Sequence, residues 1–113
     1  MRRYTELIER LRSSVLQGKG TTAPGLRQAV AARSAELGGG PAAPPGAAIP
    51  ADLRDLVEKT ALHAYRITDE EIEALRRAGR SDDEIFEIAV SAAVGGGLAR
   101  LERGLAALEG GKR

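Results

Sequence analysis

The side chains in this sequence best suited to chemistry are five polar residues between positions 52 and 71. They comprise the only histidine, a tyrosine and three carboxylates: His63, Tyr65, Asp52, Glu58 and Glu71. Such groups act as general acids and bases when a pocket brings them together. The set allows an enzyme that uses acid–base chemistry on a small carbonyl compound or lactone.

Each of these residues also has an ordinary structural explanation. Charges that recur along a helix usually mark a face in water, and His63 stands between Lys59 and Arg66 on such a face. Glu71 follows Thr68 by three residues, which is the spacing of a capping box at a helix start. Tyr65 fits the edge of a core with its hydroxyl in water. The sequence therefore favours a non-catalytic binding or scaffold protein over an enzyme.

Several other chemistries lack the residues they need. The chain has no cysteine, so it has no disulfide, no thiol chemistry and no cysteine-based metal site. A lone histidine with scattered carboxylates does not make a transition-metal site, which needs several convergent ligands. The glycines Gly38–Gly40 are not followed by the Lys-Ser/Thr of a phosphate-binding loop. We expect no metal and no cofactor, although a small-molecule ligand is compatible with the sequence.

The charge balance limits the partners of the protein. Seventeen basic and sixteen acidic residues leave a formal net charge of +1, whereas nucleic-acid and membrane-surface binders carry a concentrated basic excess. No apolar run is long enough to cross a membrane, and the N-terminus lacks the apolar stretch of a signal peptide. We expect a cytoplasmic protein without nucleic-acid or membrane partners.

The spacing of apolar residues predicts an all-α fold of about five helices in a single domain, residues 1–113. Two N-terminal helices are expected within residues 1–37 and three more within 51–108. The individual ranges are 3–17, 24–36, 51–67, 69–78 and 81–108. Between the two groups, residues 38–50 are rich in glycine and proline and are predicted to be a linker, the least ordered internal segment. Residues 109–113 form a tail that should fray.

Local signals support these boundaries. Thr21 or Thr22 is expected to cap the second helix, and Pro24 suits its first turn. Asp55 and Lys59 stand four residues apart, in the favourable order for an ion pair along a helix. Ser81 with Glu84 forms a capping box at the start of the last helix, as Thr68 with Glu71 does for the fourth.

The last helix is the longest and the most apolar. Between Ile85 and Val94 its apolar residues stand on every side, so other helices must surround it. Gly95–Gly97 follow, and we interpret them as a narrow waist in a continuous or kinked helix where another backbone comes close; a break into two helices is the alternative. Beyond the waist, leucines continue at heptad-like spacing: Leu98, Leu101, Leu105 and Leu108.

Residues 53–108 resemble the second half of AhpD-like proteins, the carboxymuconolactone decarboxylase family. The resemblance rests on ITDEEIEALRRAGRSDDEIFEIAVSAAV and the following GGGLARLERGLAAL: a short helix ending in Ala-Gly, then Ser-Asp-Asp-Glu-Ile and a long helix with a small-residue waist. It implies an AhpD-like helical fold. Residues 1–50 have no counterpart in this pattern.

The resemblance also places the catalytic positions of the family's peroxidases. Counting back from Gly79, the two cysteines of their Cys-x-x-Cys would fall at Ala64 and Ile67, and the histidine at Glu71, while an acidic residue would fall near Asp52. Thiol peroxidases need a thiolate nucleophile and a resolving thiol. The resemblance therefore implies the fold without the peroxidase activity, whereas the decarboxylase branch does not depend on the cysteines.

We further expect a homo-oligomer. The family resemblance implies a trimer or a hexamer built from trimers. Independently, a chain of this size has few elements to cover an all-round apolar helix, and exposed apolar patches mark interaction surfaces. We expect Gly96→Leu to disrupt assembly or folding, and Arg100→Ala to matter less because Arg100 should face water.

Overall fold

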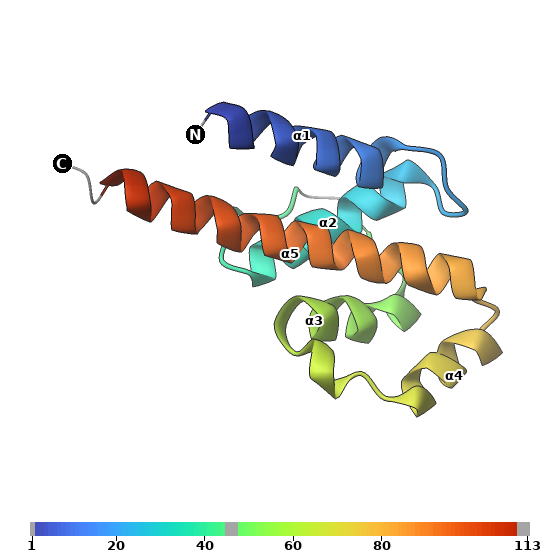
Figure 1. The fold of residues 1–113 in the computed structure, drawn as a ribbon. Coiled ribbons are helices and arrows are strands. Elements are labelled where there is room, and N and C mark those ends of the chain that lie inside the picture. Colours follow the sequence, from blue (N-terminus) through green and yellow to red (C-terminus); the bar gives the residue numbers. More distant parts are fainter. Residues whose placement is uncertain (1, 45–47, 111–113) are drawn as a thin grey trace.

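The computed structural model describes residues 2–44 and 48–110, which form five α-helices and two short 3-10 helices (Figure 1). The α-helices are α1 (Arg2–Gln17), α2 (Pro24–Leu37), α3 (Arg54–Leu62), α4 (Asp69–Arg77) and α5 (Asp82–Gly110). The 3-10 helices, η1 (Ala51–Leu53) and η2 (Ala64–Arg66), flank α3. The described residues contain no strand, so the predicted all-α fold with one long C-terminal helix is confirmed.

α5 is the helix against which the others pack. α1 runs antiparallel to it on one side, α3 and α4 lie on the opposite side, and α2 lies behind it in the view of Figure 1. The core forms where α2, α3 and α5 meet, and it includes Leu53 of η1 and Leu75 of α4. Its buried residues are aliphatic: Val30, Leu53, Leu56, Val57, Leu75, Ile85, Ile88 and Ala92.

α5 continues through Gly95–Gly97 without a break, as the waist interpretation predicts. A Cβ at Gly95 would stand 2.2 Å from the carbonyl oxygen of Ala31, and one at Gly96 would stand 2.9 Å from Ser34 Oγ. The backbone that approaches this waist is therefore α2 of the same chain. Gly97 points the other way: apart from its own turn of helix, no heavy atom of the described residues lies within 4 Å of such a Cβ.

The third helix ends earlier than the sequence predicts. Its apolar spacing predicted a helix to about Ile67, but α3 stops at Leu62. His63 has φ −150° and ψ 59°, outside the helical region, and η2 then turns the chain toward α4. The direction of η2 places α4 against the core, where Leu75 is buried and Ile72 packs against the cluster that contains Leu56. Tertiary packing therefore overrides the local pattern.

Two local predictions were wrong and two are confirmed. The N-cap of α2 is Ala23 without a side-chain cap, and the Thr22 hydroxyl donates to Glu87 instead of capping the helix. Lys59 pairs with Glu71 rather than with Asp55. Both capping boxes begin helices as predicted. The N–H of Glu84 donates to Ser81 Oγ at 3.1 Å, with the reciprocal bond also at 3.1 Å. The N–H of Glu71 donates to Thr68 Oγ1 at 3.2 Å.

The predicted linker begins as an ordered helix end. Gly39 adopts φ +93°, and the amides of Gly39 and Gly40 donate to the carbonyls of Glu36 and Ala35. This pattern closes α2, and glycine suits it because a side chain is strained at positive φ. Residues 45–47 of the linker and residues 111–113 of the tail lie outside the described residues. α5 extends to Gly110, so Glu109 and Gly110 of the predicted tail are helical.

Candidate functional site

Two of the five acid–base candidates line one cavity. Asp52 from η1 and Glu71 from α4 contribute to a cavity of about 260 Å³ between α3 and α4, with Leu56, Ile72 and Leu75 among its apolar walls. Because the capping box fixes the start of α4, it also sets the position of Glu71 at this cavity. The fold therefore brings together two of the five acid–base candidates that the sequence offers, Asp52 and Glu71.

Both carboxylates are already held by cations. Arg80 donates to the two oxygens of Asp52, each at 2.9 Å, and these hydrogen bonds hold the pKa of Asp52 below its usual value. The Lys59 ammonium donates to Glu71 and lowers the pKa of that carboxyl in the same way. Carboxylates with lowered pKa values are ionised at neutral pH, so they have no proton to donate, and they are weak bases.

The remaining candidates lie elsewhere. His63 and Tyr65 are exposed around η2, with the Tyr65 side chain 79% exposed. Their rings meet edge to face with centroids 5.9 Å apart, and the Arg66 guanidinium stands 5.7 Å from the Tyr65 ring centre. Glu58 lines a different cavity of about 370 Å³, with Arg33 and Arg54. The five residues are therefore divided among three places.

The two positions at which the family resemblance implies cysteines are also separated from the cavity that Asp52 and Glu71 line. Ala64 is exposed in η2, and Ile67 packs against the edge of the core. Neither carries a group that could attack a peroxide. Among the described residues, no group of three or more histidine, cysteine, aspartate or glutamate side chains comes together in a way that could hold a metal ion. The described part of the chain also contains no helix long and apolar enough to span a membrane.

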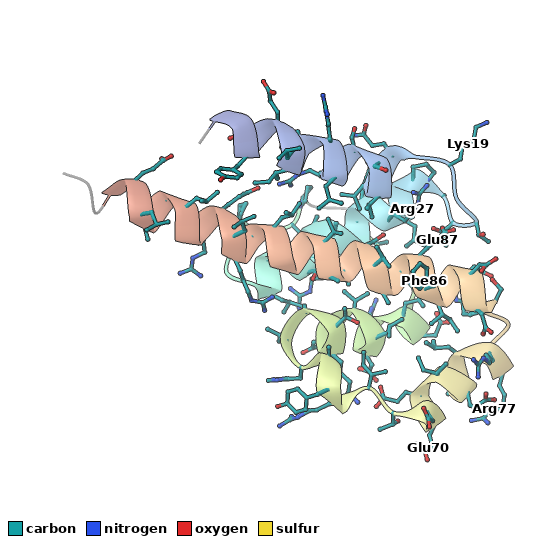
Figure 2. The ribbon with its side chains drawn as sticks, viewed as in Figure 1. Lys19, Arg27, Glu70, Arg77, Phe86 and Glu87 are labelled. Atoms are coloured by element: carbon teal, nitrogen blue, oxygen red, sulfur yellow. The ribbon has the colours of Figure 1, made fainter. Side chains whose placement is uncertain are left out.

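A buried polar network that the sequence analysis missed joins α1, α2 and α5 (Figure 2). The guanidinium of Arg27, 3% exposed, donates to the carbonyls of Val15 at 2.7 Å and Gly18 at 2.6 Å. These bonds satisfy carbonyls at the C-terminal end of α1 that lack partners within the helix. Arg27 thereby fixes where α1 ends and where the connection to α2 begins.

Glu87 completes this network from α5. It accepts hydrogen bonds from the Thr22 hydroxyl at 2.7 Å, the Thr22 amide at 2.8 Å and the Thr21 amide at 2.6 Å. These bonds lower the pKa of Glu87 to about 2. One sequence signal could have found it, since Glu87 is the only charged residue of α5 between Glu84 and Arg100. The network is a structural tie, because its hydrogen bonds join the side chains to the backbone and to Thr22, while Arg27 Nε lies 4.0 Å from Glu87 Oε1.

α5 leaves apolar residues uncovered on the side turned away from α1, α2 and α3. We call this surface the outer strip of α5. Phe86 is 68% exposed, Leu108 60% and Leu101 45%, and Figure 2 marks Phe86 on this helix. The strip consists of apolar and small residues: Phe86, Val90, Ala93, Gly97, Leu101, Gly104 and Leu108. Val90 is half-buried and the other six are exposed.

The heptad-like leucines of the sequence thus divide between two surfaces. Leu98 is buried, Leu105 is half-buried against α1, and Leu101 and Leu108 belong to the outer strip. Arg100 is exposed, as expected, but its guanidinium also donates to the carbonyl of Ala61 at the end of α3. It therefore stands beside the strip rather than on it.

Comparisons with models of protein families, with curated proteins and with solved structures find no match to this chain.

Proposed function

We propose that this protein is a non-catalytic, self-associating helical module, a binding or scaffold protein that assembles through the outer strip of α5. The observation that carries the proposal is the exposure of Phe86, Leu101 and Leu108 along one side of the longest helix. Burying a large apolar side chain stabilises by about 1.5–3 kcal/mol, so three such residues left in water favour association. Contiguous exposed apolar surface is typical of interaction sites.

The placement of the acid–base candidates supports a non-catalytic function. An enzyme of this class would need His63 enclosed with a carboxylate, but His63 is exposed between α3 and η2, outside the cavity that Asp52 and Glu71 line. Two of the three carboxylates that line that cavity, Asp52 and Glu71, are neutralised by Arg80 and Lys59; the third is Asp55 of α3. The cavity is the one observation that favours the alternative, an acid–base enzyme acting on a small carbonyl compound. It also provides the place where a small-molecule ligand would bind.

The AhpD-like relationship belongs to this proposal as a hypothesis. It rests on the motifs between residues 53 and 108, and the trimer or hexamer it implies is one form that self-association can take. Cytoplasmic location is a further part of the proposal and rests on composition. The physical argument from the outer strip does not depend on either.

Light scattering on the untagged protein over a range of concentrations tests the proposal. We expect a mass above that of one chain, which decreases on dilution or in the variant Leu101→Glu. Leu62→Glu is the matched control, because Leu62 is 40% exposed at the end of α3 and lies off the strip. A mass of one chain at every concentration, with a cooperative thermal transition, would refute self-association. Equal effects of the two substitutions would refute the role of the strip.

A further inference from the structure

The outer strip of α5 has a regular spacing. From Phe86 the steps are four, three and four residues to Gly97, and the same steps repeat from Gly97 to Leu108. Each set of steps sums to eleven residues over three turns, or about 3.67 residues per turn, which is close to the period of a straight α-helix. The strip therefore stays on one side of α5 over its whole length and does not wind around it.

Two glycines in this strip have no steric explanation in the described part of the chain. Apart from their own turns of helix, no heavy atom of the described residues comes within 4 Å of a Cβ at Gly97 or Gly104. This contrasts with Gly95, where α2 leaves no room for a side chain. Glycine weakens a helix interior relative to alanine, so this uncrowded pair on one side of α5 needs another cause. Gly110 is also uncrowded, but it is the last residue of α5 and lies off the strip. Small residues on a helix surface allow a second helix to approach closely.

The strip is also symmetric about Gly97. Three pairs flank this glycine at equal distances along the sequence: Ala93 with Leu101, Val90 with Gly104, and Phe86 with Leu108. An antiparallel second copy of α5 centred on Gly97 would place the members of each pair opposite one another. Leucine would then meet alanine, valine would meet glycine, and the two glycines at the centre would let the helices touch. The large side chains at the two ends would close the contact.

We infer that two copies of this chain pair through their α5 helices, antiparallel and two-fold symmetric, with the axis at Gly97. A two-fold interface uses the same patch on both subunits, so a self-complementary strip is what such a contact requires. No charged residue stands on the strip between Phe86 and Leu108, so the strip itself places no charge in the contact. The inference rests on the proposed self-association and specifies its geometry.

The area of the outer strip shows that other residues must also contribute to the interface between the two copies. It extends over 22 residue steps, from 86 to 108, or about 33 Å on a helix roughly 10 Å wide. The resulting ~330 Å² per copy is less than the ~800 Å² that each partner buries in a standard interface. The exposed side of α1 adds to it through Leu7, 53% exposed, and Leu11, 48% exposed.

The orientation of α1 makes this addition possible. Arg12 pairs with Glu102, and Ile8 lines a cavity with Leu105, so the first half of α1 runs antiparallel to the last half of α5. Viewed along α1, Leu7 and Leu11 are rotated by about a third of a turn from the residues that contact α5. Viewed along α5, the outer strip is rotated by about the same angle from the residues that contact α1. Because the helices are antiparallel, rotations in the same sense bring both apolar surfaces to the same side of the molecule.

The pairing also bears on higher assemblies. A hexamer with dihedral symmetry contains two-fold axes, whereas a cyclic trimer contains none. The inferred contact is therefore compatible with a dimer or with a hexamer, and it excludes a trimer as the complete assembly.

Single cysteines test the geometry directly, because the natural chain has none. Ala93→Cys and Leu101→Cys are prepared separately, oxidised alone and as an equimolar mixture, and analysed by non-reducing gels and mass spectrometry. Disulfides require Cα atoms about 4.4–6.8 Å apart. In the antiparallel pair, residue 93 lies opposite residue 101, whereas two copies of residue 93 are separated by eight residue steps, about 12 Å along the axis.

We expect the mixture to form the mixed disulfide in severalfold excess over either variant alone, and Gly97→Cys to cross-link with itself. Arg77→Cys, at an exposed position on α4, measures random collision. Cross-linking of Ala93→Cys alone at the level of the mixture would overturn the antiparallel register. If light scattering shows an oligomer while every strip variant cross-links no more than Arg77→Cys, the inferred contact is wrong and the proposed self-association stands. If light scattering shows only single chains, the proposed function itself is wrong.

Discussion

Alanine substitutions at the first and the last of the three consecutive glycines of α5 should change the free energy of unfolding in opposite directions. Gly95 faces α2, where an added Cβ would stand 2.2 Å from the Ala31 carbonyl oxygen and 2.7 Å from the Ala31 Cα. Ordinary contacts begin near 3.4 Å, so α2 must move away by about 1 Å. Because the obstacle is backbone, no side-chain rotation can relieve it. At Gly97 the same methyl group meets open space.

The magnitudes follow from two opposing terms. Alanine gains about 1 kcal/mol over glycine in a helix interior. Overpacking typically costs about 1–3 kcal/mol, and a clash with backbone belongs at the upper end. We therefore expect Gly95→Ala to lower the free energy of unfolding by about 1–2 kcal/mol and Gly97→Ala to raise it by up to ~1 kcal/mol. Gly96→Ala should lie between them, because it disturbs Ser34, whose hydroxyl bonds to the Ala92 carbonyl.

Thermal unfolding followed by circular dichroism measures these differences. For a domain of this size, 1 kcal/mol shifts Tm by about 4–8 °C. The protein should be dilute enough that self-association does not add to the stability of the wild type. A neutral or stabilising Gly95→Ala would refute the close approach of α2 and α5. A Gly97→Ala variant as destabilised as Gly95→Ala would show that α5 is oriented differently.

Two further predictions concern the polar network and the absent thiols. Glu87→Gln should reduce stability at neutral pH by about 1–2 kcal/mol, after allowance for the partial exposure of the group. Because the pKa of Glu87 is lowered from 4.5 to about 2, the ionised carboxylate contributes fully to stability above about pH 5, and this contribution is lost as the pH falls toward 2. Urea titrations over this pH range should therefore show a smaller decrease in the free energy of unfolding for Glu87→Gln than for the wild type. We also expect no hydroperoxide reductase activity, since the chain has no cysteine; heat-labile turnover of an alkyl hydroperoxide with a dithiol or NADH-linked donor would contradict this.

The helices were predictable because their signals are local. The capping boxes at Thr68 and Ser81 and the apolar spacing of the longer helices depend on residues within one or two turns. The end of α3 was not predictable in this way. His63 leaves the helix so that α4 can pack on the core, and that requirement comes from residues distant in the sequence.

The candidate surfaces were predictable only in part. The sequence shows that α5 is apolar and that it contains three glycines in a row, but it does not show which of its sides α2 occupies. Only the packed structure distinguishes Gly95, which meets Ala31, from Gly97, which faces outward. The burial of Arg27 could not be predicted from the sequence either. Its partners are backbone carbonyls at the end of another helix, and every residue type carries such a carbonyl.

The acid–base candidates show the same limit. Their spacing within residues 52–71 placed them close together along the chain, yet the break at His63 directs that residue and Tyr65 into solvent. Asp52 and Glu71 do meet at one cavity, but their cationic partners Arg80 and Lys59 could not be assigned from spacing. Proximity in sequence was therefore a poor guide to a shared site.

The central claim, that the outer strip of α5 is buried when chains associate, is tested most directly by a fluorescent reporter at Phe86. The natural chain has no tryptophan, so Phe86→Trp supplies a single indole at a side chain that is 68% exposed in one chain. We predict the blue-shifted emission of a buried indole at concentrations where the mass exceeds one chain, and a shift toward the emission of a water-exposed indole on dilution. Emission of a fully hydrated indole in the associated protein would contradict the account.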